Sequence, residues 1–186
     1  MRQKLFLLVV VALLSAVGAT GWAEKGDWLK TGTSFDPLFK DVYLASQGVA
    51  TARGTLSGIY DKSREIASLQ GIKKKYSNTE ILGILASRRS ELTKDQLSYF
   101  TDALINAEAA NQQNNTSIES CQKLQPRLEE AIEKAPEELM FQPWKARKVI
   151  KGLKNSLVQV NKTSKEGAVL AKELIEVIPL LQKIKR

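Results

Sequence analysis

Apolar residues recur in three long segments of the chain at alternating spacings of three and four, which is the pattern of packed helices. The first seam comprises Leu38, Val42, Ala45, Val49, Ala52, Leu56, Ile59, Ser63 and Ile66. The second comprises Leu97, Phe100, Leu104, Ala107, Asn111, Asn114, Ile118, Cys121, Gln125, Leu128, Ile132 and Ala135. The third comprises Ala146, Ile150, Leu153, Leu157, Val160, Ser164, Gly167, Ala171, Leu174, Ile178 and Leu181. The pattern predicts three long helices.

Residues at the ends of the seams predict where the helices begin and end. Asp36 is a good N-cap and Pro37 a good first helical residue. Gly71 suits the end of that helix. Thr93 and Gln96 form a capping box, which predicts that the second long helix starts there.

The shorter elements follow from breaks in the pattern. The apolar residues within 79–89 do not continue the next seam, so this segment is expected to form a short helix. Residues 136–143, with a proline at each end, are expected to connect the last two long helices. We expect Pro126 to kink the second long helix and Pro179 to kink or end the third.

These elements predict an all-α fold, an elongated up-and-down helical bundle of three long helices plus one short helix with coiled-coil-like packing. The bundle is expected to be a single domain over 36–186, and residues 24–35 an extended N-terminal arm or a tether. Further capping boxes at Thr116 and Thr163 would split the two later helices. The unbroken apolar phase favours continuous helices instead.

The N-terminal segment over 1–23 has the parts of a secretory signal peptide. Arg2 and Lys4 are its basic part, and 5–14 is an uninterrupted apolar run. Small residues up to Ala23 suit cleavage. We therefore expect an exported protein, periplasmic or secreted. The alternative is an uncleaved anchor, for which the apolar run is short.

Apart from Gln125, two pairs of small or polar residues interrupt the last two seams. If these helices are antiparallel about the centre of 136–143, Asn114 faces Lys165, and Asn111 and Asn114 lie level with Ser164 and Gly167. A polar residue in a seam lowers stability but sets the register, and glycine permits close approach. We interpret these four residues as a polar core layer that sets the register, with a ligand or partner slot as the alternative.

Charge is distributed unevenly along the chain. The last helix, from residue 144, holds 11 basic and 3 acidic residues, whereas residues 24–143 hold 15 basic and 17 acidic ones. A basic cluster opens this helix, namely Arg147, Lys148, Lys151 and Lys154, with Lys145 beside it. An acidic cluster ends the helix before it, namely Glu129, Glu130, Glu133, Glu137 and Glu138.

Both clusters oppose their helix dipoles, so we expect compensation by pairing across the hairpin, with Glu129 near Lys151 and Glu133 near Arg147. The alternative is that the basic cluster is a docking surface for an acidic partner or an anionic lipid surface. Export makes nucleic acid an unexpected partner.

Large apolar residues gather at the connector, where Leu139 precedes Met140, Phe141 and Trp144. The first interpretation of this apolar tip is a plug that closes the end of the core. The second is a docking tip for a partner or membrane surface.

The amino-acid composition excludes most kinds of catalytic site. The chain has no His and a single Cys, which excludes His-based general bases, Cys–His and Ser–His–Asp devices, and most zinc, haem and iron sites. We expect no catalytic residue, cofactor or metal, and the protein is not expected to be an enzyme. Cys121 lies on a seam and is interpreted as an apolar core residue, with an intermolecular disulfide as the alternative.

One short motif resembles a known family. Residues 92–96, Leu-Thr-Lys-Asp-Gln, are similar to the LTxxQ signature of the Spy-like periplasmic chaperones, which are also exported, basic and helical. The resemblance covers five residues and one copy of the motif, and it implies an ATP-independent holdase. The same Thr93 and Gln96 also form a capping box.

Together these features predict an exported, non-catalytic helical-bundle protein that acts through protein–protein interaction, as a scaffold, assembly factor or accessory subunit. The alternative is a periplasmic holdase of the Spy-like type. Neither the partner nor the oligomeric state follows from the sequence.

Overall fold

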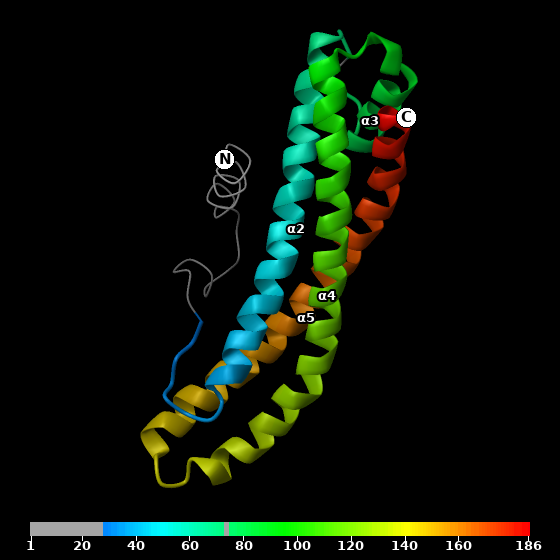
Figure 1. Cartoon of the computed structure of the whole chain (residues 1–186). Helices are drawn as coiled ribbons and strands as arrows, with labels where there is room; N and C mark the ends of the chain where they lie inside the picture. Colours follow the sequence, from blue (N-terminus) through cyan, green and yellow to red (C-terminus); the bar gives the residue numbers. More distant parts are fainter. Residues whose placement is uncertain (1–27, 73–74) are drawn as a thin grey trace, which may run out of the picture.

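The computed structural model describes residues 28–72 and 75–186, so the expected signal peptide lies outside the described residues. The helices, in order, are α2 (Asp36–Leu69), α3 (Asn78–Ser87), a 3₁₀ turn (Arg89–Glu91), α4 (Lys94–Glu138) and α5 (Pro143–Lys185). Figure 1 shows α2, α4 and α5 as long neighbours, with α4 antiparallel to both α2 and α5 and with α3 beside the C-terminal end of α5. The prediction of an elongated all-α bundle of three long helices plus one short helix is confirmed.

Capping boxes start two of these helices. The Thr93 hydroxyl accepts a hydrogen bond from the Gln96 backbone N–H (3.3 Å), and the Gln96 side chain accepts one from the Thr93 N–H (2.9 Å). Ser77 and Glu80 make the same reciprocal pair at the start of α3. Each box satisfies two N–H groups that have no partner within the helix, which makes these starts predictable from sequence.

Pro136 does not end α4 and Pro179 does not end α5, contrary to the expected connector and to one of the two outcomes expected at Pro179. α4 continues through Pro126 and Pro136, and α5 continues through Pro179. The connector is therefore only the turn over 139–142. A proline removes one helical hydrogen bond, and burial of residues on both sides of it, such as Leu124 and Leu128, outweighs that loss here. Figure 1 shows that α4 bends in the half that contains Pro126.

Asp36 does not cap α2. The residue at the N-cap position is Phe35, which makes no side-chain cap. The Asp36 carboxylate instead accepts hydrogen bonds from the backbone N–H groups of Thr31 (2.8 Å) and Gly32 (3.0 Å). It therefore turns the preceding chain back onto the bundle, a role that the cap prediction missed.

Residues 28–35 contain neither helix nor strand and lie against the hairpin of α4 and α5. The Ser34 hydroxyl donates a hydrogen bond to Glu138 at the end of α4 (3.0 Å). Lys145 Nζ donates one to the carbonyl oxygen of Gly32 (3.3 Å). A Cβ on Gly152 of α5 would lie 2.6 Å from a Leu29 methyl carbon, so Leu29 fits only because residue 152 is glycine.

The apolar core consists of two clusters at opposite ends of the molecule. The first joins α3 and the adjoining halves of the long helices, with Leu82, Phe100 and Leu174 fully buried at its centre. The second joins Phe39, Leu128 and other residues of the hairpin end. Helices of this length need both clusters, because one compact core would leave half of each apolar face exposed.

The seam of α2 matches the prediction closely, whereas that of α4 is wider. Ala110, Ser117, Leu124 and Ala131 are buried, although the predicted seam ran through their neighbours. Gln125, which was placed in that seam, is exposed. α4 packs against both α2 and α5, so its inward face spans more than one seam.

Two further properties bear on function. Cys121 is buried within the hairpin-end cluster, which confirms that it is a core residue. None of the helices in the described part of the chain combines the length and apolarity that crossing a bilayer requires.

Candidate functional site

A polar layer separates the two apolar clusters. Its centre is Asn114, which is completely buried and whose side-chain amide donates a hydrogen bond to the backbone carbonyl of Gly167 (2.9 Å). The other amide atom, Oδ1, is also buried and has no hydrogen-bond partner among the described residues. A Cβ on Gly167 would lie 3.2 Å from this oxygen and 2.7 Å from Ile118, so glycine makes room for the amide.

α2 completes the layer from its own side. A Cβ on Gly48 would overlap the Ser117 hydroxyl oxygen, so α2 and α4 lie close together there. The hydroxyls of Ser46 and Thr163 are hydrogen-bonded at 3.0 Å, which joins α2 to α5. The layer therefore ties all three long helices together by small and hydroxyl side chains.

The structure brings together two of the four residues predicted for this layer. Asn114 and Gly167 are in contact, whereas Asn111 and Ser164 are only half-buried, at its edges. Ser117 and Thr163 are buried in their place. A single seam per helix could not identify them, because they lie on the part of each helix that faces α2.

The expected register is wrong by two residues. Asn114 was expected opposite Lys165 but contacts Gly167. The physical reason is the continuation of α4 through Pro136, which moves the centre of the turn toward the C-terminus.

The alternative of a ligand slot corresponds to a shallow groove between α2 and α4, beside the layer. It has a volume of about 480 Å³, and Gly48 and Ser117 are among the residues that line it. Gln47, Gln112 and Gln113 are among its uncharged polar walls. A neighbouring depression of about 360 Å³ continues it toward Arg127, which pairs with Asp41 at 3.4 Å. No charged or aromatic side chain lines the shallow groove itself.

The apolar tip is exposed and does not plug the core. Met140, Phe141 and Trp144 are 62%, 83% and 72% exposed, and only Leu139 is buried. Figure 1 shows the physical reason, which is that the turn between α4 and α5 extends past the start of α2. Among the described residues no third helix covers the end of the hairpin there, so the plug interpretation holds for Leu139 alone.

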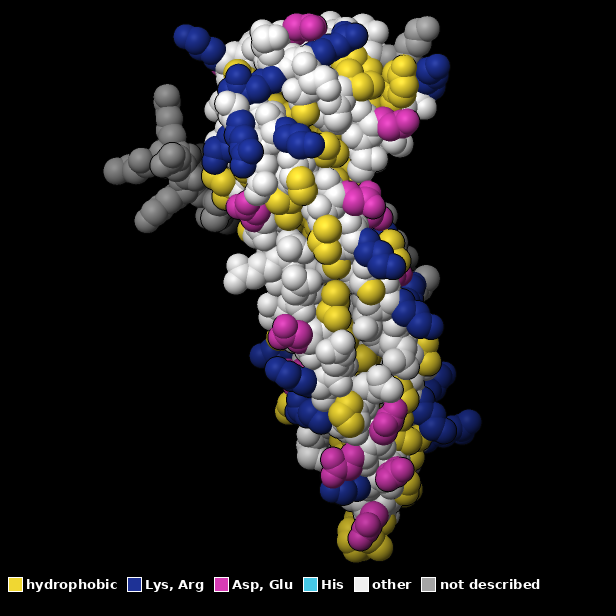
Figure 2. Space-filling view, turned by 90° about the vertical axis from the view of Figure 1, so that its right-hand side faces the viewer, with side chains coloured by type: hydrophobic (Ala, Val, Ile, Leu, Met, Phe, Trp, Pro, Cys, Tyr) yellow, Lys and Arg dark blue, Asp and Glu magenta, His cyan; other side chains and the backbone are white. Residues whose placement is uncertain are grey.

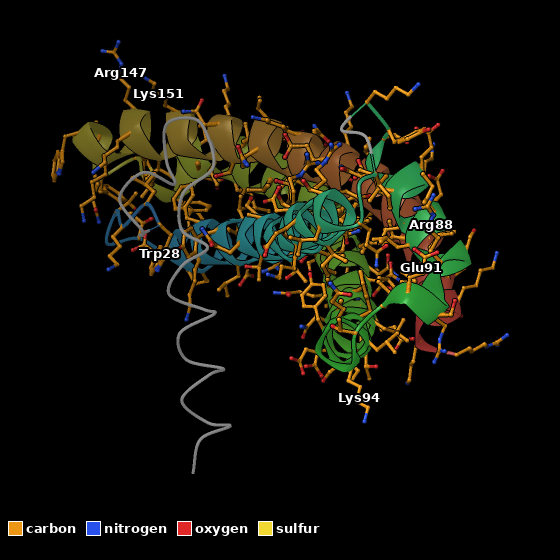
Figure 3. The ribbon with its side chains drawn as sticks, turned by 90° about the horizontal axis from the view of Figure 1, so that it is seen from above. Trp28, Arg88, Glu91, Lys94, Arg147 and Lys151 are labelled. Atoms are coloured by element: carbon orange, nitrogen blue, oxygen red, sulfur yellow. The ribbon has the colours of Figure 1, made fainter. Side chains whose placement is uncertain are left out.

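The basic cluster is exposed along its whole length, at Arg147, Lys148, Lys151 and Lys154. Figure 3 shows Arg147 and Lys151 projecting outward from α5. Figure 2 shows basic side chains following one another down the edge of the lower half, beside a group of acidic ones.

The expected pairing across the hairpin does not form. Within the described residues, no ion pair joins the basic cluster of α5 to the acidic cluster of α4. Glu130 pairs instead with Lys134 of its own helix, at 2.6 Å. Charged side chains on the outer faces of two packed helices diverge, whereas a pair four residues apart on one helix is close by geometry. The positive charge of the basic cluster therefore faces solvent.

Burial raises the pKa values of three side chains in the described part of the chain. Burial raises the pKa of the Cys121 thiol to about 11, so the thiolate is scarce at neutral pH. Burial, with nearby carboxylates, raises the pKa values of Tyr60 and Tyr99 to about 12. The described part of the chain contains no group of residues suited to hold a metal ion.

Comparison with protein families, curated proteins and solved structures found no significant match to this chain. The features of the chain itself that bear on function are the polar layer, the apolar tip and the basic cluster.

Proposed function

We propose that this chain is an exported, non-catalytic interaction protein that docks onto a protein partner through its apolar tip. The observation that carries the proposal is the 83% exposure of Phe141 between the exposed Met140 and Trp144. Aromatic residues and methionine are enriched where protein interfaces bind most strongly. Three such side chains side by side form a surface that gains free energy when a partner covers it.

The tip is also held in place. Leu139 is buried directly before it, and the Gln142 N–H donates a hydrogen bond to the Leu139 carbonyl (2.8 Å). Pro143 then starts α5 with a restricted backbone. A turn anchored at both ends loses little conformational entropy when it binds, which favours a specific partner.

The role supported best is that of a scaffold, assembly factor or accessory subunit. The test is a photo-crosslinking residue at Phe141 in cells that make the protein, with the same residue at Ile105 of α4 as the matched control. Ile105 is also exposed, at 57%, but lies in the other half of α4. We expect one protein to be captured in stoichiometric amount from position 141 and not from position 105. Capture of the same mixture of proteins from both positions would contradict docking through the tip.

A Spy-like holdase remains the alternative function. In the structure Thr93 and Gln96 make the capping box of α4, which accounts for their presence without a chaperone role. An aggregation assay with unrelated unfolding proteins separates the two functions. A scaffold leaves these proteins to aggregate, whereas a holdase suppresses their aggregation at substoichiometric or equal concentration.

Export is tested separately, by N-terminal sequencing of the protein recovered from the cell envelope and medium. We expect the mature chain to begin at Glu24. Recovery of the intact chain from Met1 in a membrane fraction would contradict both cleavage and the assigned compartment.

A further inference from the structure

We propose that the outer face of α5 binds the anionic headgroup surface of a lipid bilayer, in addition to whatever docks at the tip. The proposal starts from a row of exposed cations on one face of this helix, which we call the basic row. The row comprises Arg147, Lys151, Lys154, Lys162, Lys165 and Lys172.

The basic row is straight. Its cations, with Val158 and Val169 between them, follow one another at steps of three or four residues. The mean step is close to the helical repeat of about 3.6 residues, so the row runs parallel to the helix axis. From Arg147 to Lys172 it spans roughly 38 Å at about 1.5 Å per residue. A flat surface can therefore contact all of it at once.

Among the described residues, no carboxylate pairs with Arg147, Lys151 or Lys154 of this row. Residues 143–165 contain seven basic residues and no acidic residue. Carboxylates begin only at Glu166, which lies 3.9 Å from Lys162. The acidic cluster belongs to α4 and makes no ion pair with the basic cluster within the described residues. The stretch from Arg147 to Lys154 thus presents only positive charge to an approaching surface, whereas Lys162 pairs with Glu166.

The small number of apolar residues in the row favours lipid over an acidic helix as the occupant. A helix that packs along α5 needs an apolar residue at most steps of a seam, and this face offers only Val158 and Val169 among the cations. Both are exposed, at 69% and 53%. Trp144 lies at the start of the same face, and tryptophan beside lysine and arginine is typical of residues at a membrane interface.

Lysine and arginine near an anionic membrane each contribute separately to binding, so an exposed row produces a strong, salt-sensitive attraction. The bundle would lie along the bilayer with α5 toward it. Figure 3 shows that Arg147 and Lys151, at the start of the row, extend away from α2, so α2 does not obstruct this contact.

The test uses the chain from Glu24, which includes every described residue, in co-sedimentation with vesicles. The vesicles contain phosphatidylcholine alone or with 30% phosphatidylglycerol. The row variant replaces Arg147, Lys151, Lys154 and Lys165 with Gln. The matched control replaces Lys40, Arg88, Lys94 and Lys183 with Gln, which removes the same charge from exposed positions elsewhere. Circular dichroism verifies that both variants remain helical.

We expect the unmodified chain to bind the anionic vesicles, to bind the neutral ones weakly, and to dissociate as salt increases. The row variant should bind roughly tenfold or more weakly, and the control variant should bind like the unmodified chain. Equal loss in both variants would show that net charge alone is responsible and would overturn the proposal.

Two other results would also overturn it. If Met140→Ser with Phe141→Ser abolishes vesicle binding while the row variant retains it, the tip and not the row contacts lipid. If the unmodified chain does not bind anionic vesicles but the row variant loses an acidic protein partner in cells, the occupant is a protein. The crosslinking test at Phe141 does not depend on vesicle binding, so the two proposals can fail independently.

Discussion

The side-chain amide of Asn114 donates its hydrogen bond to the backbone carbonyl of Gly167, at 2.9 Å, in the layer that separates the two apolar clusters. This contact fixes α4 against α5 at one position, because a shift of one helical turn would bury the amide among apolar side chains. Burying Oδ1 without a partner lowers stability, and such a residue is retained where it specifies register.

Replacing Asn111 and Asn114 together with Leu is expected to raise the melting temperature. The free energy of unfolding should increase by about 1 kcal/mol, because a buried unpaired acceptor is removed. The variant should at the same time lose its single register and show several association states in size-exclusion chromatography with light scattering. Asn115→Leu, at an exposed position, is the control. A lower melting temperature with unchanged assembly would refute the register hypothesis.

Gly48→Ala is expected to destabilise the bundle by about 1–3 kcal/mol, because the added methyl group overlaps the Ser117 side chain. Adding Ser117→Ala should restore part of this loss, since it removes the hydroxyl oxygen at the contact. Gly58→Ala on the same helix has open space around it and should instead stabilise α2 by about 0.5–1 kcal/mol. Denaturant unfolding measures all three. Similar effects at positions 48 and 58 would mean that α2 does not approach α4 closely.

Acid is expected to release the segment over 28–35 from the bundle. Burial raises the pKa of Asp36, but hydrogen bonds from Thr31, Gly32 and Thr33 outweigh it and hold the pKa below its ordinary value of 3.8. Stability from this carboxylate is therefore complete above that ordinary value and is lost as the pH falls through the lowered one.

Asp36→Asn should produce the released state at neutral pH, seen as faster hydrogen exchange over 28–35 and altered Trp28 fluorescence. Asp102→Asn, an exposed carboxylate on α4, is the control and should change neither signal. Unchanged protection in Asp36→Asn would show that apolar contacts alone hold the segment.

Arg89 is expected to stabilise the C-terminal end of α5. Its guanidinium donates hydrogen bonds to the carbonyl oxygens of Ile184 (2.9 Å) and Lys185 (3.4 Å), which have no partners further along the helix. Arg89→Ala should lower the free energy of unfolding by about 0.5–1.5 kcal/mol and speed hydrogen exchange in the last turn. The adjacent, exposed Arg88→Ala should do neither. Equal effects at both positions would exclude a capping role.

Reversing the charge of Arg147 and Lys151 to Glu is expected to change the free energy of unfolding by less than about 0.5 kcal/mol, since both side chains are exposed. The alternative account, in which these residues pair with Glu129 and Glu133, requires a larger decrease in the free energy of unfolding at low salt. It also requires recovery when the two glutamates are changed to Lys. Thermal melts at two salt concentrations distinguish the accounts.

The sequence by itself determined the helices, because helix formation and capping depend on residues close in the chain. The seam of α2 from Val42 to Ile66 and the capping box of Thr93 with Gln96 were both predictable on this basis. The separation of basic from acidic residues along the chain was equally visible. Burial of Cys121 followed from its place in a seam.

Only the tertiary structure decided how the helices face one another. Whether Pro136 ends α4 depends on the packing around it, and that single outcome sets the turn and places Asn114 at Gly167. The burial of Ser117 depends on α2, which is distant in sequence. The exposure of Phe141 and the unpaired state of Lys151 likewise depend on where three helices end in space. These are long-range properties, and a local pattern of apolar and polar residues does not contain them.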